Sequence, residues 1–141
     1  MDPKGFSLIE LVIVLIIIGL LAAIALPAYR VSIEQSNAQT AQNNLLSISA
    51  AQEQFYDTHN FYCIKDSDPS CANYVDLNHN LQLHIASNDP FQYSCSDTAE
   101  NIKYNCTASD GTDTLTLDTN NPQMMIQCAS ANRNNCPSNL Q

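Results

Sequence analysis

Positive charge is scarce in this sequence. Lysine and arginine together number 5, against 14 aspartates and glutamates, which gives a formal net charge of -9. The basic residues are scattered singly along the chain, at Lys4, Arg30, Lys65, Lys103 and Arg133. Because they form no basic stripe in the sequence, we do not expect broad electrostatic capture of nucleic acid. The acidity is typical of a soluble, exposed surface.

The sequence also lacks the common patterns of catalysis and metal binding. It has no HExxH pair, no Ser-His-Asp order, no nucleophile elbow and no CxxC pair. Aspartates at 66, 68, 110 and 113 raise the question of calcium, but the D-G-T-D stretch does not match an EF-hand loop. We therefore predict that the chain is not an enzyme and that it has no metal or cofactor site.

A long apolar run, FSLIELVIVLIIIGLLAAIAL, occupies residues 6–26. As a helix it would span about 30 Å, the thickness of the hydrocarbon core of a bilayer. No small-residue cleavage site with a clean break follows, so we expect the run to be retained as an anchor. Lys4 precedes the run and predicts that the rest of the chain lies outside the cytoplasm, although Arg30 on the far side opposes this orientation.

The run contains one acidic residue, Glu10, and no Lys, Arg or His. An ionised carboxylate inside a membrane span costs about 2.5–3.5 kcal/mol. One interpretation is that Glu10 lies near the headgroups, where this cost is small. The other is that it pairs with a positive charge from a second molecule.

All six cysteines follow the apolar run, at Cys63, Cys71, Cys95, Cys106, Cys128 and Cys136. An even number of cysteines in a small exported domain predicts disulfides. The sequence cannot fix the pairing, because many connectivities are possible. Short loops suggest, as a hypothesis, the pairs Cys63–Cys71, Cys95–Cys106 and Cys128–Cys136.

The stretch KGFSLIELVIVLIIIGLLAAIALPAY closely resembles the N-terminus of type IV pilins. The resemblance implies that a prepilin peptidase cuts between Gly5 and Phe6 and methylates the new amine of Phe6. Residues 1–5 would then be a leader peptide. It further implies that Glu10 of an incoming subunit neutralises the Phe6 amine of a neighbour, which would fix the axial register. Ser7 lies where the family often has Thr.

Two residues interrupt the first part of the expected helix, Gly19 and Pro27. We predict a kink at Pro27, because helix signals resume after it. The pilin resemblance adds that the stretch between Gly19 and Pro27 loses helical structure within the filament. Farther on, one face of an amphipathic helix is predicted by the spacing of Ala38, Ala41, Leu45, Ile48 and Phe55.

After Asn60 the apolar residues alternate with polar ones, as in half-buried strands. The alternating runs are Leu81–Ile85, Phe91–Cys95, Ile102–Cys106 and Leu115–Leu117. We therefore predict an α+β fold, in which a long N-terminal helix packs on a roughly four-stranded antiparallel sheet stabilised by disulfides. His84 falls in the outward phase of its run, which predicts an exposed side chain.

The expected parts are a leader (1–5), a helix for the membrane and later the filament core (6–28), and a periplasmic or extracellular head domain (29–141). The stretch AQNNLLSISAAQEQFYDTHNFYC is similar, more loosely, to minor pilins of Gram-negative bacteria. In pilins the region bounded by a C-terminal disulfide, here Cys128–Cys136, is often exposed and variable, and the resemblance implies that it makes adhesive or partner contacts.

These resemblances imply a structural subunit of a type IV pilus, a minor pilin that contributes to assembly and to adhesion, twitching motility or DNA uptake. Its partners would be other pilin subunits, the prepilin peptidase, the inner-membrane assembly machinery and, before assembly, the membrane. The precursor would be a single-pass inner-membrane protein, and the mature chain part of a cell-surface pilus. The alternatives are a pseudopilin of type II secretion and a pilus-displayed DNA receptor.

Overall fold

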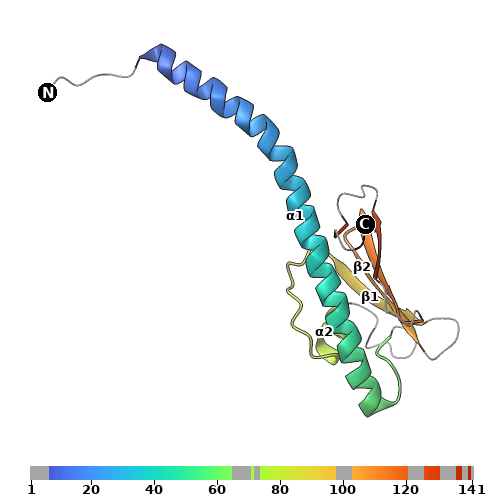
Figure 1. Cartoon of the computed structure of the whole chain (residues 1–141). Helices are drawn as coiled ribbons and strands as arrows, with labels where there is room; N and C mark the ends of the chain where they lie inside the picture. The colour runs from blue at the N-terminus through green and yellow to red at the C-terminus, as the bar shows by residue number, and fades with distance from the viewer. Residues whose placement is uncertain are drawn as a thin grey trace. The chain divides into compact units, whose positions relative to one another are not determined.

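The computed structural model describes residues 7–64, 71, 74–97, 103–120, 126–130, 136–137 and 140. Its elements, in chain order, are α1 (Leu8–His59), α2 (Tyr74–Asn80), β1 (Gln92–Asp97), β2 (Tyr104–Ser109), β3 (Asp113–Asp118) and β4 (Ile126–Ser130) (Figure 1). The chain divides into two compact units, Met1–Glu34 and Gln35–Gln141, and α1 contributes to both.

The first unit contains the N-terminal part of α1. Ser7 precedes the first helical residue, and its main-chain carbonyl accepts hydrogen bonds from the N–H groups of Glu10 and Leu11. Gly19 and Pro27 both lie inside one continuous helix. A proline within a helix removes one main-chain donor, and here the helix continues on both sides of it. The kink at Pro27 and the loss of helix in the filament stay predictions.

In the second unit, the other part of α1 packs on the sheet, and its buried face has the helical spacing that the sequence predicts. Its buried residues are Ala38, Ala41, Leu45, Ile48, Ser49 and Gln52, and Phe55 is half-buried. The helix ends at His59 because Asn60 adopts a left-handed conformation (φ 60°), in which its N–H donates to the Tyr56 carbonyl at 2.8 Å.

The sheet is an antiparallel meander with the strand order β1-β2-β3-β4. One face of the sheet joins the same hydrophobic core as α1 through Tyr93, Cys95, Tyr104, Cys106, Ala108, Leu115, Leu117 and Ile126. Alternate residues of the strands are exposed or half-buried, as expected when only one face is covered. The α+β architecture predicted from the sequence is therefore confirmed.

The strand predicted at Leu81–Ile85 is wrong. Its alternation is genuine, since Leu81 and Ile85 are buried while Gln82 and His84 are exposed, but its main-chain groups are used elsewhere. Gln82 is left-handed (φ 52°), and the N–H groups of Gln82 and Leu83 donate back to the last turn of α2, a Schellman motif. The side chain of Asn78 then bonds both the N–H and the carbonyl of Ile85.

The fourth strand is instead β4, which the sequence did not indicate, and α2 was not predicted either. Only Ile126 is buried among the residues of β4, which lies at an edge of the sheet, so its sequence carries no clear alternation. In α2, Leu77 is buried and Val75 is largely exposed. One buried side chain in a single short element is too little for a periodic signal.

The β2–β3 hairpin turns at Asp110 and Gly111. The Asp110 carboxylate accepts hydrogen bonds from the N–H groups of Thr112 (2.8 Å) and Asp113 (2.7 Å) and from the Thr112 hydroxyl (2.8 Å). Partial burial alone would raise the pKa of Asp110, but these hydrogen bonds outweigh it and hold the pKa below its usual value. Gly111 supplies the positive φ of 94° that the turn requires.

Three disulfides join Cys63 to Cys71, Cys95 to Cys106, and Cys128 to Cys136. These are the pairs that the short loops suggest. Cys95 and Cys106 are directly opposite each other on β1 and β2, and both side chains point into the core. The first and third bridges tie the connection before α2 and the segment after β4 to the rest of the head, where a small core gains most from cross-links.

Candidate functional site

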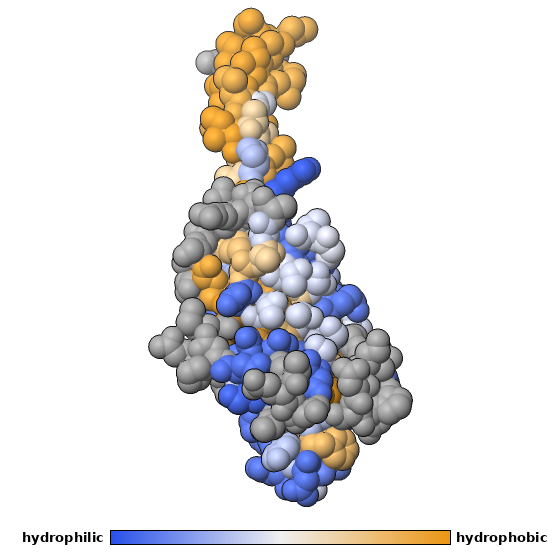
Figure 2. Space-filling view, turned by 90° about the vertical axis from the view of Figure 1, so that its right-hand side faces the viewer, coloured by the Kyte–Doolittle hydropathy of each residue, from blue (hydrophilic) through white to orange (hydrophobic). Residues whose placement is uncertain are grey.

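The N-terminal part of α1 exposes an almost unbroken apolar surface. From Leu8 to Leu26 its large hydrophobic side chains are between 39% and 80% exposed, and Figure 2 shows apolar side chains gathered on the helix. By length and composition this helix could cross a membrane. An exposed apolar surface of this extent requires a cover, either lipid or other protein.

Glu10 lies in the first turn of α1, where it caps its own helix. Its Oε2 accepts a hydrogen bond of 2.9 Å from the Ser7 N–H, the Glu half of a capping box. The carboxylate is therefore held at the N-terminal end of the helix, where the helix dipole also favours negative charge. Gly5 and Phe6, the expected processing site, lie outside the described residues. The structure therefore shows the position of the Glu10 carboxylate but not that of the Phe6 amine.

Within the described residues of the second unit, Gln35–Gln141, Lys103 is the only lysine or arginine, and it is exposed. Lys65 and Arg133 lie outside the described residues, as do Asp66 and Asp68. No group of three or more potential metal ligands occurs in the part of the chain that the structure describes. His84 is exposed, and it lines an open hollow of about 540 Å³ together with His79.

An aromatic cluster lies at the C-terminal end of α1. The rings of Phe55 and His59 stack with centroids 4.0 Å apart, and Phe61 packs edge-on against both. Tyr56 and Tyr62 stack at 4.6 Å. Partial burial, followed by the charge of Glu53, raises the pKa of Tyr62. Sequence reasoning assigned Phe55 to the core face and did not anticipate the cluster.

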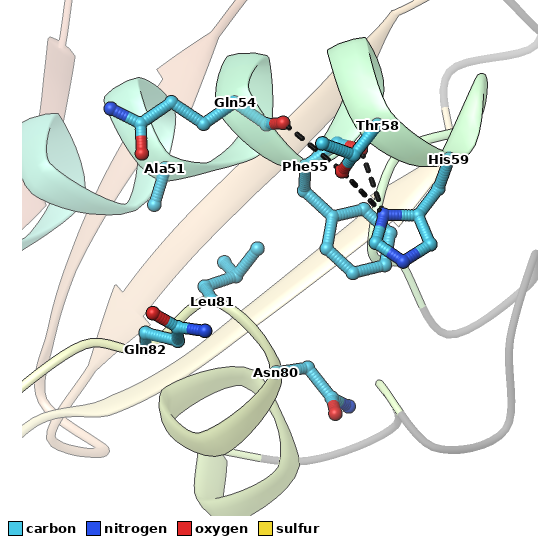
Figure 3. A pocket seen from close by; sticks show the side chains of 8 residues that line it. All are labelled: Ala51, Gln54, Phe55, Thr58, His59, Asn80, Leu81 and Gln82. Carbon is cyan, nitrogen blue, oxygen red and sulfur yellow. Dashed lines mark hydrogen bonds between the residues drawn. The ribbon is translucent and has the colours of Figure 1, made fainter.

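Beside this cluster lies a hollow of about 360 Å³, which we call the His59 hollow (Figure 3). It is lined by Ala51, Gln54, Phe55, Thr58, His59, Asn80, Leu81 and Gln82. The first five come from the last turns of α1, and the other three from the end of α2 and the turn after it. The Schellman motif at the end of α2, which is present where the sequence predicted a strand, therefore positions Gln82 at the hollow.

The contacts of the His59 ring favour one of its neutral tautomers. Nδ1 lies 2.7 Å from the Thr58 Oγ1 and 3.1 Å from the Phe55 carbonyl. The Phe55 carbonyl can only accept, and the Thr58 hydroxyl has main-chain carbonyls as acceptors for its single proton, so these contacts favour the neutral tautomer that carries its proton on Nδ1. The lone pair of Nε2 is then free to accept a hydrogen bond, and Figure 3 shows this nitrogen pointing away from the α1 turn.

A long helix, apolar at first and amphipathic later, that packs on a four-stranded antiparallel meander defines a pilin-like protein. Two family profiles match the chain: "Prokaryotic N-terminal methylation motif" over residues 1–26 and "Type IV minor pilin ComP, DNA uptake sequence receptor" over residues 27–130. The second match covers most of the chain, which therefore belongs to the ComP family of type IV minor pilins.

Curated relatives agree with this family. A fimbrial protein of Moraxella nonliquefaciens is 42% identical over 74 residues, covering 52% of this chain and 47% of its own. The type IV major alpha-pilin of Moraxella bovis is 57% identical over 42 residues, covering 30% and 26%. The type IV major pilin protein PilA of Myxococcus xanthus is 42% identical over 59 residues, covering 42% and 27%. The chain thus matches less than half the length of each relative. No solved structure matches it.

Proposed function

We propose that this chain is a minor structural subunit of a type IV pilus, anchored by residues 6–28 in the inner membrane before assembly and by the same helix in the filament core afterwards. The uncovered apolar surface of α1 between Leu8 and Leu26 carries this proposal, because lipid and a bundle of like helices can cover it in turn. Residues 29–141 form the head, which is periplasmic at first and displayed on the pilus later.

Glu10 provides the assembly register. After a prepilin peptidase cuts between Gly5 and Phe6, the new amine of Phe6 carries a positive charge next to a helix that is otherwise apolar. Pairing this amine with Glu10 of a neighbouring subunit removes much of the cost of two isolated charges in an apolar bundle. The capping bond to Ser7 keeps the carboxylate at the N-terminal turn, ready for this contact.

Two substitutions separate the charge of Glu10 from its capping role. Glu10→Gln keeps an amide oxygen that can cap Ser7 but removes the charge, whereas Glu10→Leu removes both. In a deletion strain complemented with each variant, we expect both to lose incorporation into sheared filaments. Normal incorporation of Glu10→Gln would show that capping alone matters. Glu34→Gln, a change at an exposed acid farther along α1, is the control and should incorporate normally.

The deletion strain also separates the pilus from its closest alternative. It is scored for piliation, twitching, DNA uptake and protein secretion. Loss of a pilus phenotype supports the proposal. Loss of secretion alone would assign the chain to a type II secretion pseudopilus instead.

A second candidate function, reception of DNA, is favoured by the family profile that covers residues 27–130 and whose description names a DNA uptake sequence receptor. The charge of the chain opposes strong non-specific binding, so any affinity must come from few phosphate contacts and from base recognition. Lys65, Lys103 and Arg133 are the basic residues of the second unit, Gln35–Gln141, that could supply the phosphate contacts.

This candidate is tested with the full chain in detergent micelles and a random library of duplex DNA. Enrichment of one sequence, with binding that weakens in Lys65→Gln, Lys103→Gln and Arg133→Gln, would support DNA reception. Arg30→Gln, which changes a basic residue of the first unit, is the matched control. If no preferred sequence is recovered at low salt, DNA reception is excluded. The proposed role in filament structure would not be affected by that result.

A further inference from the structure

The residues of the His59 hollow all belong to the second unit, Gln35–Gln141. We propose that this hollow binds a neutral saccharide unit. Its volume of about 360 Å³ falls within the range of about 300–1,000 Å³ that is typical of small-molecule sites. Its lining combines aromatic and aliphatic surface with neutral polar groups, the two features that a sugar ring presents.

The apolar part of the hollow suits the C–H face of a sugar ring. Phe55 and Leu81 are at least half-buried and held in place by the core, and the stacked ring of His59 extends the aromatic surface outward. Phe61 supports this stack from its edge. A flat surface that is fixed before binding loses little conformational entropy when a ligand docks.

The polar part of the hollow suits hydroxyl groups. The side-chain amides of Gln54 and Gln82 can each both donate and accept, as sugar hydroxyls do, whereas the Asn80 amide nitrogen already donates to the Cys71 Sγ. The Nε2 of His59 adds an acceptor in the tautomer that the contacts of Nδ1 favour. Gln82 is held at the hollow by the Schellman motif at the end of α2, so its position does not depend on a flexible loop.

Charge favours a neutral ligand over a phosphorylated one. Among the described residues that line the hollow, none is Lys, Arg, Asp or Glu, and the chain as a whole carries a formal charge of -9. The net negative charge would repel a phosphate, and the described lining offers it no cation. A nucleotide has a planar base that could stack here, but it also has this phosphate, so the chemistry selects the saccharide.

The test is saturation-transfer NMR on the full chain in a sugar-free zwitterionic detergent, because glycoside detergents would compete. The probes are the methyl glycosides of N-acetylglucosamine, N-acetylgalactosamine, galactose and mannose, with thymidine monophosphate as the charged comparison. We expect saturable transfer to at least one glycoside and none to the nucleotide. Transfer to the nucleotide alone, or to none of the glycosides, would overturn the proposal.

Variants tie the binding to the hollow. His59→Phe keeps the stack on Phe55 but removes the Nε2 acceptor, and Gln82→Ala removes one amide. Each should weaken the glycoside affinity by about fivefold or more, the effect of one lost hydrogen bond. Gln127→Ala, at an exposed glutamine on β4, should leave the affinity unchanged. Equal affinities in all four proteins would contradict the site. Pilus assembly does not depend on this outcome, so the two proposals fail separately.

Discussion

The side chain of Gln52 and the main chain of Cys63 exchange two hydrogen bonds inside the core. The amide nitrogen of Gln52 donates to the Cys63 carbonyl at 2.7 Å, and the Cys63 N–H donates to the amide oxygen at 2.8 Å. Both residues are fully buried. The Gln52 amide thus satisfies both main-chain groups of Cys63, as a neighbouring strand would. It holds the segment around Cys63, which follows α1, against the helix.

Replacing Gln52 should therefore destabilise the head. Gln52→Leu leaves both main-chain groups of Cys63 unpaired in the core, and we expect a loss of about 2–4 kcal/mol in the free energy of unfolding. Denaturant unfolding of the full chain in detergent measures it through tyrosine fluorescence, since the chain has six tyrosines and no tryptophan. Gln39→Leu changes an exposed residue of the same helix and should shift the free energy by less than about 0.5 kcal/mol.

Because of Tyr104, we expect the free energy of unfolding to fall at alkaline pH. Burial, only partly offset by the hydrogen bond to Ser49, raises the pKa of Tyr104 from its ordinary value of 10.0 to about 12. Because the folded state favours the neutral phenol, its contribution is complete below pH 10 and is lost as the pH rises toward 12. We expect about 2 kcal/mol to disappear over this window.

The measurement is the free energy of unfolding between pH 8 and pH 12. Tyr104→Phe should lower stability at pH 8, because the Ser49 hydroxyl loses its partner, but should flatten the alkaline decline. Tyr62, whose pKa is also raised, remains in both proteins. Tyr29→Phe, at an exposed position, should decline as the unmodified chain does. An unchanged decline in Tyr104→Phe would show that another group controls it.

The disulfides should differ in how easily reductant reaches them. Cys128 is half-buried on the edge strand β4, whereas both cysteines of Cys63–Cys71 and of Cys95–Cys106 are buried. We expect a limiting dose of phosphine under native conditions to open Cys128–Cys136 first. Alkylation followed by peptide mass spectrometry identifies the order in which the disulfides open. The same dose of phosphine in guanidinium should open the three disulfides without this preference, because the unfolded chain exposes all of them.

The Cys128–Cys136 disulfide should also contribute to the free energy of unfolding. Replacing both Cys128 and Cys136 by serine should lower the free energy of unfolding by roughly 2–3 kcal/mol, the chain-entropy value for so short a loop. Loss of the fold would contradict this estimate, because the core assembled by α1 and the sheet does not include Cys136.

Much of the fold could be predicted because it rests on repeated signals. Ala38, Ala41, Leu45 and Ile48 recur at helical spacing, and all four are buried as that spacing implies. Alternation likewise located β1, β2 and β3, but only part of each: the runs at Ile102–Cys106 and Leu115–Leu117 cover three residues each of β2 and β3, and Ile102 lies outside the described residues. It failed at Leu81–Ile85, where burial alternates but the hydrogen bonds close a Schellman motif, because side-chain period reports exposure and not main-chain pairing.

The His59 hollow could not be predicted in the same way. Its lining residues come from the end of α1 and from the end of α2, and no periodic pattern in the sequence relates His59 to Gln82. Their proximity follows from two left-handed residues, Asn60 and Gln82, and from the bond between Asn78 and Ile85. Neither is a glycine, so the sequence gives little warning of either turn. The N-terminal motif was recognisable because it is local and continuous.

The most direct test of assembly is the intact mass of this chain in filaments sheared from cells that express it at its natural level. We predict a chain that starts at Phe6, carries one added methyl group and retains three disulfides. A chain that keeps residues 1–5, or one that is abundant in the membrane but missing from the filaments, would contradict the account.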